Sequence, residues 1–356
     1  MIKKEEGRFY QLDFLKAIAI VVVILIHVLA NRLNQPFFSF LWNWLHFVVV
    51  FFVFCSGYIL TAKYQNYNFN LKNTMFWFIK RIKRLVAPFY LYLFLHYFLW
   101  FLLPQFFSGL GLKKDARFFI QSLIFSGGVD LNWLVLLFLQ LTFLFPLFIF
   151  LSKKKKWQFF TLSFSFLFGL LFIFYRPKNY RWLMWLSWSG VFFLSMLVFS
   201  KRKKDNFYFL KLAGFSLVIS LSLFFIFLPF PFILFAHKYP PDSLYLFYGL
   251  TILFFLLFIS KLKIIENNFF KKGYQIVSKN SYYLYFFSYI FLDLFETKTK
   301  KLNFSLNPFI ESALIFFLSL IVILIVKLII KNTARFFIKS KIYFKFSLPI
   351  NIFDKN

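Results

Sequence analysis

Cysteine and acidic residues are the two components that this sequence has in short supply. The 356 residues include one cysteine, Cys55, and only 12 Asp and Glu against 42 Lys and Arg. A single thiol cannot form an intramolecular disulfide or a cysteine-rich metal site, and no His/Glu spacing fits a zinc helix, so we expect no metal. Few carboxylates lie in apolar segments, which disfavours a carboxylate-driven proton or sodium transporter. The sequence also lacks a glycine-rich phosphate loop and the Ser/His/Asp order of a soluble hydrolase.

Apolar residues, by contrast, are abundant: 61% of the chain is hydrophobic and 26% is aromatic. A soluble domain of this length could not bury so much apolar surface, so lipid must be part of the solvent. A hydrocarbon core about 30 Å thick needs roughly 20 apolar residues per helix. The sequence therefore predicts an all-α polytopic membrane protein with about ten transmembrane helices, at 12–31, 41–62, 85–103, 131–151, 157–175, 182–200, 212–236, 243–260, 280–296 and 308–330.

Two further segments, the first apolar run and residues 116–126, bear on the predicted membrane topology. The first apolar run is too long for the core of a cleavable signal peptide and is taken as a span. Segment 116–126 is too short to cross a bilayer and is expected to be re-entrant or interfacial. We expect one membrane domain over 1–330, followed by a basic cytoplasmic tail over 331–356.

The basic residues that give the formal charge of +30 lie mainly between the predicted spans. With the N-terminus inside, 31 of the 42 Lys and Arg fall on the cytoplasmic side, in the N-terminal end, alternate loops and the tail. This bias predicts that both termini are cytoplasmic. No basic soluble module is present, so we do not expect nucleic-acid binding.

The first apolar segment carries three ionisable residues, Asp13, Lys16 and His27. At 100° per residue, Lys16 and His27 project from one helix face about 16 Å apart, and Asp13 lies about 40° off the same line. An ionisable group inside the membrane is costly unless it faces a partner or a wet cavity. His27 is therefore either a packed neutral imidazole or part of a functional stripe, and the shared face favours the stripe.

Two arginines mark the inner end of the third predicted span. Arg81 and Arg84 are three residues apart, so they are neighbours on a helix face and suit bidentate phosphate binding. Anchoring under the positive-inside rule explains the same residues without any ligand. In the second span, Ser56 and Gly57 are expected to let two helices approach closely.

On the outer side, His237, Lys238 and Asp242 flank a pair of prolines, and these charged groups are candidates for the mouth of a cavity. His46 and His96 are single residues within apolar spans, and we expect both to have packing roles with their hydrogen bonds satisfied.

Taken in order, these segments resemble the integral-membrane acyltransferases of acyltransferase family 3. The matching stretches cover nearly the whole chain and are LDFLKAIAIVVVILIH, FFVFCSGYIL, RIKRLVAPFY, NWLVLLFLQLTFLFPLF, KYPPDSLYLFYG and NSYYLYFFSYIF. Lys16 stands where an Arg is commoner in the family, and Ser288 lies close to where many members have a His. The sequence is similar to the stand-alone members, which carry no extracytoplasmic hydrolase-like domain.

The resemblance implies a multi-pass protein of the bacterial plasma (inner) membrane. It would move an acyl group, usually acetyl from acetyl-CoA, from the cytoplasm to a hydroxyl of an envelope or exported carbohydrate. Lys16, Arg81 and Arg84 would hold the CoA phosphates, and His27 would be the catalytic residue, acting as a general base or as a transient acyl carrier. Asp13, His237 and Asp242 are the substrate-binding candidates, and Asp13 could instead orient Lys16 or cap the helix.

Two other functions remain open at this point. A ten-span body with an internal polar stripe also fits a translocator or exporter of a polysaccharide or lipid-linked glycan. A non-catalytic partner or sensor of another membrane protein is the third possibility. Glycan-assembly proteins are the expected partners in the first two cases.

Overall fold

The computed structural model describes residues 4–5, 8–200, 207–227, 233–260, 265, 267–302 and 306–339. The α-helices of these ranges are α1 (Tyr10–Leu29), α2 (Pro36–Trp44), α3 (Val48–Tyr64), α4 (Leu71–Leu102), α5 (Ala116–Leu123), α6 (Asn132–Leu151), α7 (Lys155–Phe174), α8 (Tyr180–Leu183), α9 (Trp185–Ser200), α10 (Phe207–Phe227), α11 (Ser243–Ile259), α12 (Asn268–Leu302) and α13 (Pro308–Lys339). Short 3-10 helices are η1 (Ala30–Arg32), η2 (Leu45–Phe47) and η3 (Leu234–His237). Two two-residue strands, β1 (Lys4–Glu5) and β2 (Arg8–Phe9), pair antiparallel before α1.

All ten predicted spans overlap helices, as expected for apolar segments whose backbone groups must pair internally in lipid, and residues 228–232 of the span predicted at 212–236 lie outside the described residues. Among the described residues, eight helical segments are long and apolar enough to cross a membrane. The other two predicted spans correspond to α11, which is apolar but has 17 residues, and to α12, which has 35 residues and carries polar side chains along much of its length. The protein is thus an all-α polytopic membrane protein; the sidedness of its termini remains a prediction.

The structure corrects two predicted loops. We expected residues 63–84 and 261–279 to be cytoplasmic loops, but α4 begins at Leu71 and α12 at Asn268. Asn70 caps α4 by accepting a hydrogen bond from the backbone N–H of Asn73, and Lys and Arg are good helix formers that extend their apolar stems along a helix surface. Arg81 and Arg84 therefore lie within a long continuous helix.

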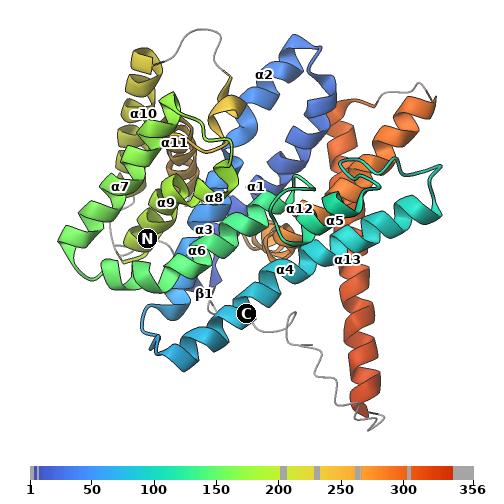
Figure 1. Cartoon of the computed structure of the whole chain (residues 1–356), viewed down its shortest axis with the longest axis horizontal. Helices are drawn as coiled ribbons and strands as arrows, with labels where there is room; N and C mark the ends of the chain where they lie inside the picture. The colour runs from blue at the N-terminus through green and yellow to red at the C-terminus, as the bar shows by residue number, and fades with distance from the viewer. Residues whose placement is uncertain are drawn as a thin grey trace.

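Segment 116–126 contains the eight-residue helix α5, in agreement with its prediction as a segment too short to cross. At the C-terminal end, α13 continues past residue 330 to Lys339, so the first part of the predicted tail is helical. Residues 340–356 lie outside the described residues. In Figure 1, α13 extends well below the rest of the bundle.

Helix α1 lies at the centre of the bundle, between a group formed by α7, α9, α10 and α11 and a group formed by α4, α5, α12 and α13 (Figure 1). It packs along α3, α12 and α13. Asp13 contacts Ser278, and His27 contacts Tyr289, so α1 and α12 run parallel. The polar side chains of the first span consequently face the most polar long helix of the bundle.

Gly57 has the packing role predicted for it, because α3 and α9 approach closely there. A Cβ atom at this position would lie 2.6 Å from the carbonyl oxygen of Phe192 and would collide with the Ser195 hydroxyl. The prediction of a close helix contact is confirmed.

Candidate active site

The stripe of ionisable residues on α1 lies along its seam with α12. Near the start of α1, the Ser278 hydroxyl donates a hydrogen bond of 2.6 Å to Asp13 Oδ1. Fourteen residues later, the His27 ring packs edge-on against Tyr289, with 5.4 Å between ring centroids. Both side chains therefore lie on the side of α1 that faces α12, as the helical spacing predicts.

Near the start of α1, Lys16 forms an ion pair with Asp13. The distance from Lys16 Nζ to Asp13 Oδ1 is 3.6 Å, and the Asp13 side chain is 5% exposed against 20% for Lys16. Asp13 is thus a buried carboxylate held by α12 and by Lys16. This geometry favours the alternative in which Asp13 orients Lys16 over direct contact with a substrate.

The two arginines of α4 lie beside α12 and next to a third cation. Arg81 and Arg84 both repel the charge of Lys63 at the end of α3, so the three side chains share one electrostatic environment. The Nε atom of Arg81 is buried and has no hydrogen-bond partner among the described residues. Tyr282 of α12 fixes the adjacent turn of α4 by donating a 2.8 Å hydrogen bond to the carbonyl of Leu85.

Sequence reasoning did not identify Lys63. It stands near the C-terminal end of α3, six residues after Gly57, where positive-inside anchoring is a sufficient explanation. Only the packing of α3 and α4 in three dimensions shows that it belongs with the arginines. The structure joins Lys16 to Asp13 and groups Lys63 with Arg81 and Arg84.

Toward the other end of the seam, His27 lines a small recess between α1, α12 and α13. Its walls also include Tyr289, Ile315 and the hydroxyl-bearing Ser288. The recess is closely packed, and no hydrogen bond joins the His27 ring to another described residue. Ser288 thus lies in the same recess as His27.

His96 has the satisfied packing role predicted for it, whereas His46 does not. The His96 ring lies 2.9 Å from Asp293 Oδ2 and 3.2 Å from the Tyr92 hydroxyl, and both His96 and Asp293 are fully buried. His46 is 3% exposed, packs on Trp42 and has both ring nitrogens buried with no hydrogen bond to any described residue. Aromatic packing around His46 excludes polar neighbours, which sequence alone could not show.

The loop between α10 and α11 brings His237 and Asp242, the two substrate-binding candidates of this segment, into contact with each other. His237 Nδ1 bonds to Asp242 Oδ2, and Arg176 lies 3.7 Å from the same carboxylate oxygen. Asp242 is fully buried and caps α11 by accepting from the backbone N–H of Tyr245 at 3.1 Å. In this arrangement His237 and Asp242 hold the loop in place; a substrate contact by either is still only a prediction.

Lys238 is the third ionisable residue of this segment that was predicted to line the mouth of a cavity. Its charge acts on both His27 and His46, and its Nζ lies over the rings of Trp133 and Tyr239 at 5.3 and 4.9 Å from their centroids. Burial lowers the pKa of Lys238 to about 7, although the Asp130 carboxylate acts in the opposite direction. A lysine whose pKa is close to neutrality and whose charge acts on His27 is suited to exchange protons in chemistry at this end of the seam.

Comparison with known proteins adds one finding to this geometry. A family model described as an acyltransferase domain, acyltransferase 3, matches residues 9–328. No curated protein and no solved structure matches the chain. The matched range contains α1 to α12 and most of α13, with all of the residues described above.

Proposed function

The chain belongs to acyltransferase family 3 and is a multi-pass membrane acyltransferase, and from this premise we propose which groups it transfers. Its donor is an acyl-CoA, most simply acetyl-CoA, bound at the cytoplasmic side. Its acceptor is a hydroxyl of an envelope or exported carbohydrate on the other side. The enzyme then acts as an O-acetyltransferase of the bacterial plasma membrane, next to glycan-assembly proteins.

The donor end of the proposal is supported by the cluster of Lys63, Arg81 and Arg84. Three neighbouring cations repel one another, and an anion between them relieves that repulsion. The buried Nε of Arg81 has no hydrogen-bond partner in the described part of the chain, and a guanidinium is suited to bidentate bonds with phosphate. These residues therefore fit the phosphates of CoA, which supplies the acyl group as a thioester.

The transfer step is assigned to His27. As a general base, its imidazole removes the proton from the acceptor hydroxyl while that oxygen attacks the thioester carbonyl. The C–S bond breaks, the CoA sulfur leaves as a thiolate, and the proton held by His27 is available to it. In the second possibility His27 itself carries the acyl group before the acceptor takes it. Both need a ring nitrogen without a protein partner, which is the observation that carries the proposal.

Substitution of His27 tests this assignment. We expect His27→Ala to abolish O-acylation of cell-surface glycan, measured by mass spectrometry, while the polymer still reaches the surface. Acetyl-CoA binding by the purified variant serves as the control for folding, because His27 is remote from the arginine cluster in this assignment.

The alternative outcomes separate the candidate functions. Normal acylation by the His27→Ala protein would contradict the catalytic assignment. Loss of surface polymer itself would favour the translocator, since export and acylation would then depend on the same residue.

A further inference from the structure

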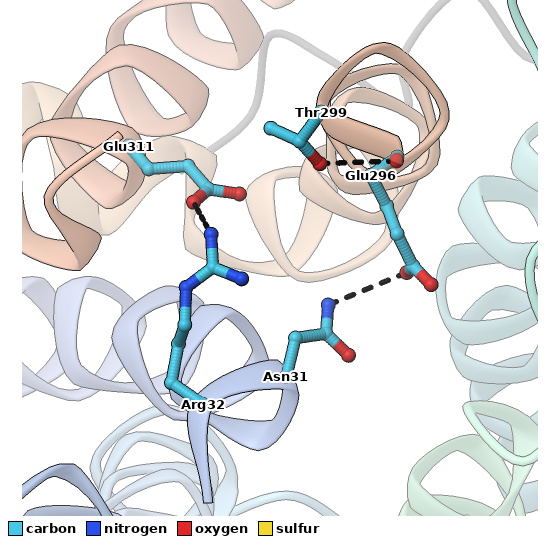
Figure 2. Close-up of a pocket in the computed structure, with 5 residues that line it drawn as sticks. All are labelled: Asn31, Arg32, Glu296, Thr299 and Glu311. Atoms are coloured by element: carbon cyan, nitrogen blue, oxygen red, sulfur yellow. Dashed lines mark hydrogen bonds and ion pairs between the residues drawn. The ribbon is translucent and has the colours of Figure 1, made fainter. Parts of the chain in front are cut away.

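A second, more polar cavity lies directly beyond the His27 recess. It has a volume of about 240 Å³ and is lined by Asn31, Arg32, Glu296, Thr299 and Glu311. Figure 2 shows the side chains of Asn31 and Arg32 reaching from the end of α1 and η1 toward the carboxylates of Glu296 and Glu311. None of these residues has a part in the donor site or in the transfer step.

The same three helices build both cavities. Asn31, in η1 directly after α1, follows His27 by four residues, a rise of about 6 Å. On α12, Glu296 is two turns beyond Tyr289, and on α13, Glu311 is one turn before Ile315, so each pair projects from one helix face. The polar cavity therefore lies next to the recess of His27, farther along the same three helices. The positive-inside rule places this end of α1 on the extracytoplasmic side.

The polar contacts across the cavity are long. Asn31 Nδ2 donates to Glu296 Oε2 at 3.3 Å, and Arg32 lies 3.5 Å from Glu311 Oε2 (Figure 2). Glu311 is only 4% exposed, and its Oε2 atom has no hydrogen-bond partner among the described residues. The ion pair with Arg32 offsets part of the cost of burying this carboxylate, and a ligand hydroxyl that donates a hydrogen bond to Oε2 would offset more of it.

The charge of the cavity restricts the ligand. Two carboxylates and one guanidinium line it, so its lining carries a net negative charge. Carboxylates only accept hydrogen bonds, whereas Asn31 and Arg32 can donate them. Such a lining matches the vicinal hydroxyls of a sugar ring and disfavours a ligand that brings its own carboxylate, because the like charges would be partly desolvated together.

We propose that this cavity is the acceptor-binding site and that it selects a non-acidic sugar over a uronic or other acidic sugar. Glu296 and Glu311 accept hydrogen bonds from ring hydroxyls, Asn31 and Arg32 donate to ring or hydroxyl oxygens, and the hydroxyl that is acylated points down toward His27. This inference rests on the proposed function, since it names the acceptor of that reaction.

The test uses purified full-length protein, acetyl-CoA and methyl glucopyranoside as the acceptor probe. We expect Glu296→Gln and Glu311→Gln to raise the KM for methyl glucopyranoside about tenfold with little change in kcat, because each weakens a charge-assisted hydrogen bond outside the reacting atoms. Methyl glucuronide, which has a carboxylate in place of the C6 hydroxymethyl group, should inhibit the wild type weakly and each Gln variant more strongly.

Asp115→Asn is the matched control, because it removes a carboxylate at the N-cap of α5 outside both cavities. Asn caps a helix as well as Asp does, so this variant should keep the wild-type KM. Unchanged KM and unchanged inhibition in both Gln variants would overturn the acceptor site alone. Failure of the wild type to acylate methyl glucopyranoside would contradict the proposed function, and this inference with it.

Discussion

Arg81 illustrates how a single residue acquires a role from its surroundings. In the sequence it is one of several basic residues near the inner end of a span, and anchoring explains it. In the fold its Nε is buried with no hydrogen bond to any residue that the structure describes, and the charges of Lys63 and Arg84 act in the same region. An unpaired buried donor on a cation is expensive for the protein alone, which is the physical argument for an anionic ligand.

Neutralising Arg81 should therefore weaken donor binding. We expect Arg81→Gln to lower the affinity for acetyl-CoA at least about tenfold, since hydrogen bonds to charged groups contribute roughly 1.5–3 kcal/mol. The measurement is isothermal titration of purified protein in detergent, with Arg81→Gln/Arg84→Gln expected to be weaker still.

Lys83→Gln is the control for this experiment, because it removes the same charge from the same helix at an exposed position. Its affinity should stay within about twofold of wild type, since surface charges are screened by salt. If Arg81→Gln and Lys83→Gln behave alike, the arginine has no specific role in donor binding.

At the scale of elements, the contact between α3 and α9 holds the central helices together. Gly57 is the residue that permits it, because the carbonyl of Phe192 and the hydroxyl of Ser195 occupy the space of a side chain. Helix contacts in membranes depend on such small residues, since lipid gives no hydrophobic driving force for association.

A methyl group at this contact should destabilise the bundle. We expect Gly57→Ala to lower the free energy of unfolding by about 1–3 kcal/mol, the usual cost of overpacking, seen as a lower Tm in detergent. Gly214→Ala in α10 is the matched control, since its added Cβ would meet no atom within 4 Å and Ala has the better helix propensity. Equal Tm values for the two variants would show that the close approach does not limit stability.

At the scale of the whole molecule, Lys238, the buried lysine between α10 and α11, makes the free energy of unfolding depend on pH. The pKa of Lys238 is about 7 in the folded protein and about 10.4 in an unfolded chain. At a pH between these two pKa values, Lys238 is protonated in the unfolded chain and deprotonated in the folded protein. Stability should therefore rise with pH across this window, by at most about 1.4 kcal/mol per pH unit.

Thermal unfolding of wild type and Lys238→Met between about pH 7 and about pH 9 checks this linkage. The Tm of wild type should increase relative to that of the variant as the pH rises, because methionine has no proton to bind. Parallel Tm curves for the two proteins would mean that Lys238 keeps its ordinary pKa in the fold.

The sequence by itself determined the membrane class, the helical architecture, the ten helical segments and the resemblance to the family. Each depends on local properties: the length and apolarity of runs, which a bilayer dictates directly, and motifs in a set order. Helical periodicity also placed Asp13 and His27 on one face of α1, since that geometry needs only the residue spacing.

Tertiary structure alone decided which distant residues meet. Lys63 joins Arg81, Ser288 shares the recess of His27, and Glu296 and Glu311 close a polar cavity with the end of α1. The tertiary structure also showed that Asp242 caps helix α11 and that the charge of Lys238 acts on His27. These relations could not be predicted because they depend on how helices pack and rotate against one another, and one helix's sequence does not record which face its neighbour covers.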